Sequence, residues 1–222
     1  MDDRVSLKNM TPYLLILLVT VCLLFHAQYS FCQSDESFYL AVVNRLYQGD
    51  LLITDEWHPV QFYAPILLPL YSLYMLFSGN GDGMILFFRL MYILFAGFTG
   101  LMVIKTFHHY CGRWLAAIAS LMLLLYSRAN ISGMSYYNLS VQFTVLALCM
   151  TAVCFHGKKG RQKILCSLLS GVFIACAVLC CPYLAIFAVI GLIIFSIIKE
   201  SRHAALCMDC SPSNRHENKS LS

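Results

Sequence analysis

The feature that most constrains this chain is a series of long segments without a charged side chain. Residues 9–34 and residues 164–198 contain no Asp, Glu, Lys or Arg. A transmembrane helix needs about 20 apolar residues to cross about 30 Å of hydrocarbon, so both segments are long enough to span a bilayer. The chain is 59% hydrophobic and 12% charged, about half the charge of a typical soluble domain. We therefore expect an all-α fold, a polytopic membrane helical bundle with the lipid bilayer as a partner.

Six segments are predicted to span the membrane. They are residues 13–32, 84–104, 114–126, 137–155, 164–181 and 183–198. The third is short and lies between Arg113 and Arg128, whose stems would have to extend toward the interfaces. The last two form one uncharged run that would reach about 50 Å as a single helix, so we expect a turn at Pro182.

Residues 62–77 are also apolar, but Pro65 and Pro69 interrupt them, and the basic residues decide how this segment lies. Short loops rich in Lys and Arg face the cytoplasm. If residues 62–77 lie on the outer surface, twelve of the fifteen Lys and Arg residues are cytoplasmic; if they span, only four are. We therefore predict about six spans, both termini cytoplasmic, and residues 62–77 as a juxtamembrane or re-entrant helix in the first outer loop.

The start of that loop is predicted to form a helix that lies in the membrane interface. Its apolar residues recur at the spacing of one helical stripe. Ser34 or Asp35 could cap the start of this helix, and Gly49 its end. A capping role for Asp35 needs no catalysis, and the two roles are compatible. The stripe consists of Tyr39, Val42, Val43, Leu46 and Tyr47.

Two further groups of polar residues, one at residues 55–61 and one at residues 128–138, lie in the predicted outer loops and could bind a substrate. The first group could instead be a solvated loop, and the second a polar turn with interfacial tyrosines. The chain carries no nucleotide-binding fingerprint, and topology accounts for its basic residues, so no nucleic-acid partner is expected. No cofactor is assigned, although a divalent metal ion at the acidic residues remains open. The groups are Asp55, Glu56, His58 and Gln61, then Arg128, Asn130, Tyr136, Tyr137 and Asn138.

Three stretches of the sequence together resemble a known family. They are the loop after the first span, DESFYLAVVNRLYQGD, the acidic stretch DEWHPVQFYAPILLPLYSLY and the segment GDGMILFFRLMYILFAG. They are similar to the N-terminal half of GT-C glycosyltransferases, most of all the bacterial RgtA/B/C/D-like or mannosyltransferase-like membrane proteins. The resemblance covers about residues 10–198. It implies transfer of a sugar from a polyprenyl-phosphate donor to a glycan, lipid or protein acceptor, at the outer face of a bacterial plasma membrane.

The resemblance also implies roles for individual residues. Asp35, with Glu36 beside it, matches the acidic motif whose carboxylate acts as general base on the acceptor hydroxyl. Arg128 and Arg89 are the cations offered to the departing lipid phosphate. Asn138 stands where several relatives carry Asp, which leaves a second acid there in doubt. The acceptor site would be lined by Asp55, Glu56, His58 and Gln61, with Tyr136 and Tyr137 nearby.

The chain is shorter than the enzymes it resembles. We expect residues 1–198 to be a GT-C-like transmembrane module and residues 199–222 a polar, disordered cytoplasmic tail, whose abrupt onset suggests truncation or a frameshift. On that interpretation the chain alone is not a competent transferase. The alternative is a non-catalytic binding or assembly half-module that pairs with another chain. A transporter is disfavoured because the acids lie in loops rather than within spans.

Overall fold

The computed structural model describes residues 7–29, 34–55, 58–126, 133–156, 160–191 and 193. The regular structure of this part of the chain is helical, and no strand occurs in it. The predicted all-α membrane bundle is thereby confirmed. Its labelled helices are α1 (Leu7–His26), α2 (Ser34–Gln48), α3 (Ala64–Ser78), α4 (Met84–Cys111), α5 (Arg113–Leu125), α6 (Tyr136–His156) and α7 (Gly160–Cys180).

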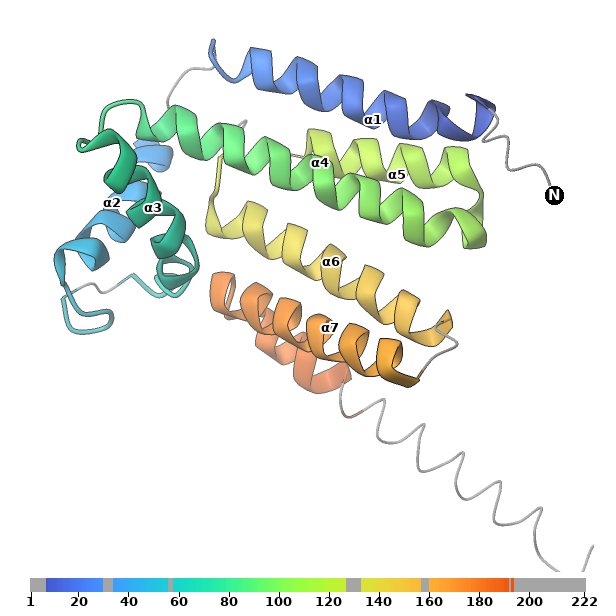
Figure 1. Cartoon of the computed structure of the whole chain (residues 1–222). Coiled ribbons are helices and arrows are strands. Elements are labelled where there is room, and N and C mark those ends of the chain that lie inside the picture. The colour runs from blue at the N-terminus through green and yellow to red at the C-terminus, as the bar shows by residue number, and fades with distance from the viewer. Residues whose placement is uncertain are drawn as a thin grey trace, which may run out of the picture. The chain divides into compact units, whose positions relative to one another are not determined.

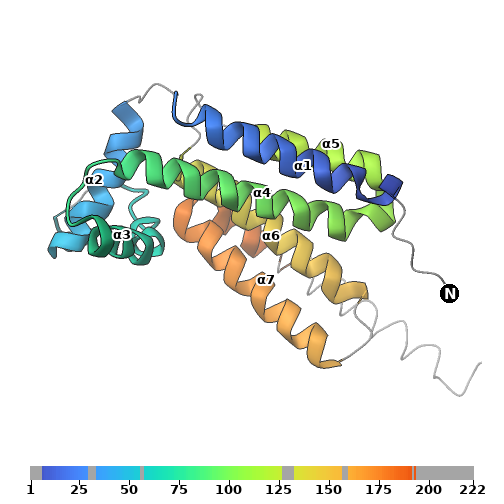
Figure 2. The same ribbon diagram turned by 45° about the horizontal axis from the view of Figure 1, so that its top comes forward.

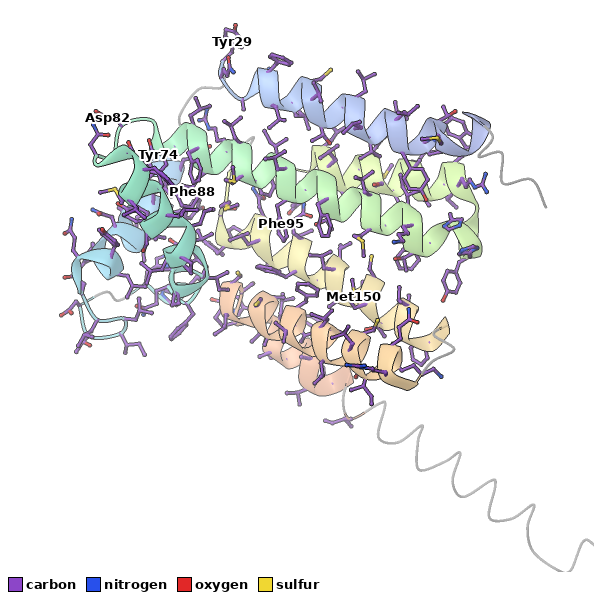
Figure 3. All side chains as sticks on the ribbon, viewed as in Figure 1. Tyr29, Tyr74, Asp82, Phe88, Phe95 and Met150 are labelled. Atoms are coloured by element: carbon purple, nitrogen blue, oxygen red, sulfur yellow. The ribbon has the colours of Figure 1, made fainter. Side chains whose placement is uncertain are left out.

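The labelled helices all belong to one compact unit, Met1–Pro182, and Tyr183–Ser222 form a second. Within the first unit, α1, α4, α5, α6 and α7 run side by side, whereas α2 and α3 lie together at one end (Figure 1; Figure 2). Helix α4 is central and packs against α1, α5 and α6, while α7 packs against α6. Side chains fill the space between these helices; Phe95 of α4, for example, meets Phe143 of α6 with ring centroids 5.5 Å apart (Figure 3).

Consecutive helices of the bundle point in opposite directions, so the connections fall at two ends (Figure 1). We call the end that carries α2, α3 and the start of α6 the loop end. The opposite end, where α4 meets α5 and α6 meets α7, is called the basic end. Its described charged residues are Lys105, Arg113, Arg161 and Lys163. The two predicted outer loops therefore share one end of the bundle.

Within the described ranges, three helices are long and apolar enough to cross a membrane, namely α4, α6 and α7. Helices α1 and α5 are shorter apolar helices that pack beside them. Several boundaries differ from prediction. Helix α1 covers residues 7–26 rather than 13–32, α4 continues beyond residue 104 to Cys111, and α7 begins at residue 160 rather than 164. Helix α4 stops at Gly112, whose φ of 82° and ψ of 159° suit glycine and break the helix before α5.

Close approach of helices α1, α4 and α5 depends on two glycines of α4. A Cβ atom at Gly97 would lie 2.8 Å from Thr20 Oγ1 of α1, and one at Gly100 would lie 2.7 Å from Ser120 Oγ of α5. The Ser120 hydroxyl donates a hydrogen bond to the Gly100 carbonyl at 2.5 Å. Small residues at crossing points let helix backbones approach and add dispersion contacts, which drive helix association in membranes.

The predicted juxtamembrane helices are present at the loop end. In α2, Val42 and Val43 are buried in a cluster with Tyr63, Leu67 and other residues of the α3 region. The predicted stripe thus packs onto α3. Glycine also ends α2, since Gly49 has a φ of 105°.

Helices α2 and α3 are further joined by Tyr71, whose hydroxyl donates a hydrogen bond to Asn44 Oδ1 at 2.7 Å. Burial raises the pKa of Tyr71 above its ordinary value, and the neighbouring Tyr47 raises it further.

The predicted break near Pro182 is confirmed. Helix α7 ends at Cys180, and residues 184–191 are helical again after the turn. The predicted boundary between residues 198 and 199, and the tail of residues 199–222, lie outside the described residues.

Candidate functional site

A buried ion pair joins the beginning of α2 to α4 at the loop end. Arg89 Nε donates to Glu36 Oε1 at 2.9 Å and to Oε2 at 3.1 Å, and Arg89 Nη2 also contacts Oε2. Arg89 Nη1 donates to the carbonyl of Ala27 at 3.3 Å, just beyond α1. Both charged side chains are only 6% exposed. One guanidinium therefore connects three segments that are far apart in the sequence.

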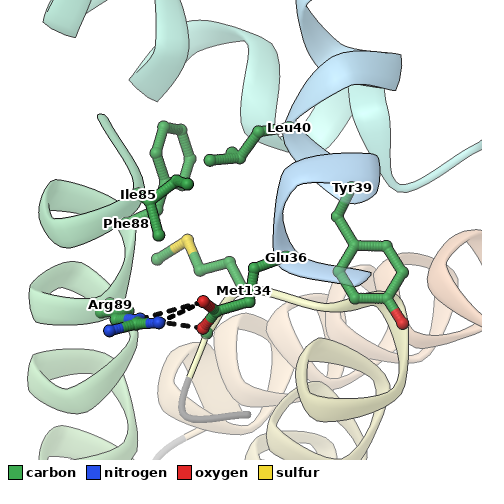
Figure 4. Close-up of a pocket in the computed structure, with 8 residues that line it drawn as sticks. Glu36, Tyr39, Leu40, Ile85, Phe88, Arg89 and Met134 are labelled. Atoms are coloured by element: carbon green, nitrogen blue, oxygen red, sulfur yellow. Dashed lines mark hydrogen bonds and ion pairs between the residues drawn. The ribbon is translucent and has the colours of Figure 1, made fainter. Parts of the chain in front are cut away.

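The space beside this pair is small. A cavity of about 10 Å³ is lined by the two charged residues together with Tyr39, Phe88 and Met134 among others (Figure 4). Such a volume holds about one water molecule. Glu36 and Arg89 are thus bound to each other, and the cavity beside them is too small for a substrate.

An aromatic cluster lies next to the ion pair and is built from α2, the segment before α3 and the start of α6. Tyr39 meets Tyr63 at 6.1 Å and Tyr136 at 5.5 Å between ring centroids. The ring centroid of His58 lies 5.2 Å from that of Phe38 and 6.2 Å from that of Tyr136. Tyr63 is buried, whereas His58 is half-buried and Phe38 is exposed, so His58 and Phe38 form the accessible rim of the cluster.

The segment between α2 and α3 is held by its own polar groups. Arg45 pairs with Asp50 at 2.7 Å and also donates to the carbonyl of Asp55 at 2.7 Å. The Asp55 carboxylate accepts the N–H of Leu51 at 2.7 Å.

Gln61, predicted to line the acceptor site, is buried in this loop. Its Oε1 accepts the N–H of Ile53 at 2.9 Å. Ile53 has a φ of 75°, a conformation that branched side chains rarely adopt. The Gln61 amide therefore supports a strained turn of the loop.

Asn138, like Gln61, stabilises local structure, in this case the start of α6. The Asn138 N–H donates to Ser135 Oγ at 3.2 Å, which makes Ser135 the N-cap of the helix. The Asn138 side-chain amide donates to the Gly133 carbonyl at 2.9 Å and is completely buried. Asn138 thus closes the turn that presents Tyr136 and Tyr137, whose rings lie 3.9 Å apart between centroids.

The structure brings most of the predicted site residues to the loop end. Glu36, Arg89, His58, Tyr136, Tyr137 and Asn138 gather around the ion pair and the aromatic cluster, while Gln61 and Asp55 hold the adjoining loop. Asp35 occupies the second position of α2, but its side chain lies outside the described residues, as do Glu56 and Arg128. Among the described residues, no group of three or more His, Cys, Asp or Glu could hold a metal ion.

Sequence reasoning did not identify Tyr63 and Phe38 as parts of the site. Phe38 stands beside Tyr39 in α2 and outside the apolar stripe. Tyr63 carries no motif; its hydroxyl donates to the carbonyl of Tyr39 at 3.0 Å, a contact between residues 24 positions apart. Only the packing of α3 on α2 reveals this pairing.

The loop end therefore combines an electrostatic anchor with a partly open aromatic surface. Tyrosine rings provide apolar faces with hydroxyl groups at their tips, and the half-buried imidazole of His58 adds hydrogen-bonding nitrogen atoms. Comparison of the chain with protein-family models, curated proteins and solved structures found no match.

Proposed function

We propose that this membrane protein is a module of a GT-C-type glycosyltransferase that uses a polyprenyl-phosphate sugar donor and acts at its loop end. The observation that carries the proposal is the convergence of the Glu36 end of α2, His58 and the Tyr136–Tyr137 pair, which come from three separate segments. A sugar acceptor or donor needs apolar ring faces, hydrogen-bonding tips and a carboxylate base in one place. The loop end offers these groups together.

The proposal gives the two neighbouring acids different roles. The Glu36 carboxylate is engaged by Arg89 in a buried pair, so it is a positioning group in the proposal. Asp35 is then the candidate general base, because it is adjacent in α2 and Glu36 fixes the beginning of that helix. Arg89 is likewise occupied, which leaves Arg128 as the proposed cation for the lipid phosphate.

The aromatic cluster is proposed to bind the sugar. His58 and Phe38 form its accessible rim, and Tyr136 lies behind His58.

The proposed location is a bacterial plasma membrane, with the loop end on the outer face and both termini in the cytoplasm. The charges support this orientation. The acidic residues with described side chains, Glu36, Asp50, Asp55 and Asp82, lie in α2 and the loops of the loop end, whereas the described charged residues at the basic end are Lys and Arg.

The donor-binding part of the proposal is tested by retention of a polyprenyl-phosphate-linked sugar on the full chain in lipid nanodiscs. We expect Phe38→Ala to weaken binding about tenfold, because loss of one stacked aromatic face removes about 1 to 3 kcal/mol. Phe155→Ala is the matched control, since Phe155 is an exposed phenylalanine of α6 near the basic end. Equal retention by the wild type and Phe38→Ala would exclude the rim of the aromatic cluster as the sugar site.

A second candidate is a non-catalytic half-module that pairs with another chain. It is favoured by the small cavity beside Glu36 and Arg89, which admits about one water molecule rather than a sugar. In that case the buried pair holds the loop end in shape for a partner, and Asp35→Asn leaves function unchanged.

A further inference from the structure

A second concave feature lies on the bundle, away from the aromatic cluster. It is an apolar groove of about 520 Å³ formed by α4, α5 and α6. Cys111 and Tyr126 are the only lining residues whose side chains carry a polar atom. The lining residues are Val103, Phe107, Cys111, Ala116, Ala119, Met122, Leu123, Tyr126, Val141, Val145 and Leu148.

The groove exists because α5 and α6 each pack against α4 but not extensively against each other. Ala116 and Ala119 leave the α5 wall low, while Leu148 and Met122 stand exposed at the rim. The lining covers α5 from Ala116 to Tyr126, and a helix of that length extends about 15 to 20 Å. The groove therefore runs along the membrane-spanning direction.

Its dimensions favour one kind of occupant. A helix beside α5 would occupy about 1,600 Å³, taken as a cylinder about 10 Å wide and about 20 Å long. All the empty space of the groove, its open side included, is about 1,020 Å³, so a whole helix does not fit within it. A single hydrocarbon chain is narrow enough to enter.

Charge at one end indicates the kind of headgroup. The groove reaches the basic end through Phe107 and Cys111, and Arg113 is three residues before Ala116, on the same side of α5 by helical spacing. The described charged residues at this end are all basic. An anionic phosphate near the bilayer surface gains about fivefold in binding for each nearby Arg or Lys.

We propose that this groove is a binding site for an anionic phospholipid of the surrounding bilayer. One acyl chain lies between α5 and α6 on α4, and the phosphate lies near Arg113. The site is independent of the proposed transferase activity, because it requires neither the loop end nor a sugar.

The test is photocrosslinking of the full chain in vesicles of phosphatidylcholine that contain a trace of phosphatidylglycerol with a diazirine midway along one acyl chain. We expect adducts to concentrate on peptides of residues 103–126 and 141–148. Ala119→Phe should reduce them to the background yield of the other lipid-facing helix surfaces, because the phenyl ring would occupy the groove that the acyl chain enters. Leu148→Phe fills the groove from α6 and should act in the same direction.

Two controls isolate the site. Ala175→Phe makes the same change at an exposed position of α7 outside the groove, and it should leave the adduct yield unchanged. Arg113→Gln should reduce the yield of the phosphatidylglycerol probe about fivefold and leave the yield of a diazirine phosphatidylcholine unchanged. Arg161→Gln should leave the yields of both probes unchanged. The proposal would be overturned if adducts were as frequent on the exposed face of α7 as on the groove peptides. It would also be overturned if Ala119→Phe and Ala175→Phe gave equal yields.

Discussion

The buried pair of Glu36 and Arg89 gives the sharpest stability prediction. Each side chain is 6% exposed, and Arg89 donates to both carboxylate oxygens and to the Ala27 carbonyl. Removing one member leaves the other charge buried without its partner, which costs about 3 to 5 kcal/mol. We expect Glu36→Leu and Arg89→Met each to lower the free energy of unfolding by that amount.

The double variant distinguishes a buried ion pair from ordinary packing. Glu36→Leu with Arg89→Met removes both charges, and replacement of a buried pair by apolar residues is often neutral or stabilising. Allowing about 1 kcal/mol for the lost bond to Ala27, the double variant should be less than about 2 kcal/mol below the wild type. The coupling energy between the two sites is then at least about 3 kcal/mol.

The assay is reversible unfolding in mixed micelles, followed by helical circular dichroism. Asp50→Asn is the matched control, because Asp50 pairs with Arg45 at 2.7 Å but both side chains are 42% exposed. An exposed pair contributes less than about 1 kcal/mol. Single variants that cost no more than this control, or a double variant as unstable as the sum of its parts, would refute the reasoning.

Three further predictions concern packing, hydrogen bonding and capping. Gly100→Leu should destabilise the bundle by at least about 1 to 3 kcal/mol, because its side chain would meet Ser120, whereas Gly171→Leu on α7 meets nothing within 4 Å and should be neutral in the same unfolding assay. Tyr71→Phe should cost about 0.5 to 1.5 kcal/mol. Because folding raises the pKa of Tyr71, the contribution of this residue to stability is complete below the ordinary pKa of 10.0 and is lost as the pH rises through the raised pKa. Alkaline absorbance titration of the wild type against Tyr71→Phe measures the raised pKa. Ser135→Ala should remove the N-cap of α6 and cost about 1 kcal/mol, measured as faster amide hydrogen exchange in its first turn.

The arrangement of the bundle could be predicted because hydrocarbon and charge act on whole segments. Apolar segments of sufficient length predicted the long helices, and the positions of Lys and Arg favoured residues 62–77 as a helix outside the bundle of spans, which the structure shows as α3 beside α2. The helical stripe containing Val42 and Val43 gave α2. Boundaries were less accurate, because the end of α4 is decided by the φ of Gly112 rather than by polarity.

The site was predictable as a set of residues but not as a set of roles. Asp-Glu in α2 looked like two equivalent acids, whereas the partner of Glu36 is 53 positions away in the sequence. Spacing cannot reveal such a contact, because it depends on how α2 lies on α4. Asn138 likewise looked like a ligand-binding residue, although a nearby Ser135 and a helix start do form a recognisable capping pattern.

The measurement that tests the proposed function most directly is sugar transfer from a polyprenyl-phosphate donor by membrane vesicles that contain the full chain, so that any partner chain is present. Asp35→Asn is compared with the wild type, and Asp82→Asn, an exposed acid of the same end, is the control. If Asp35 is the general base, transfer in Asp35→Asn should fall about 10²- to 10⁴-fold while insertion and the Asp82→Asn rate stay unchanged. Equal transfer by the wild type and Asp35→Asn would contradict the account.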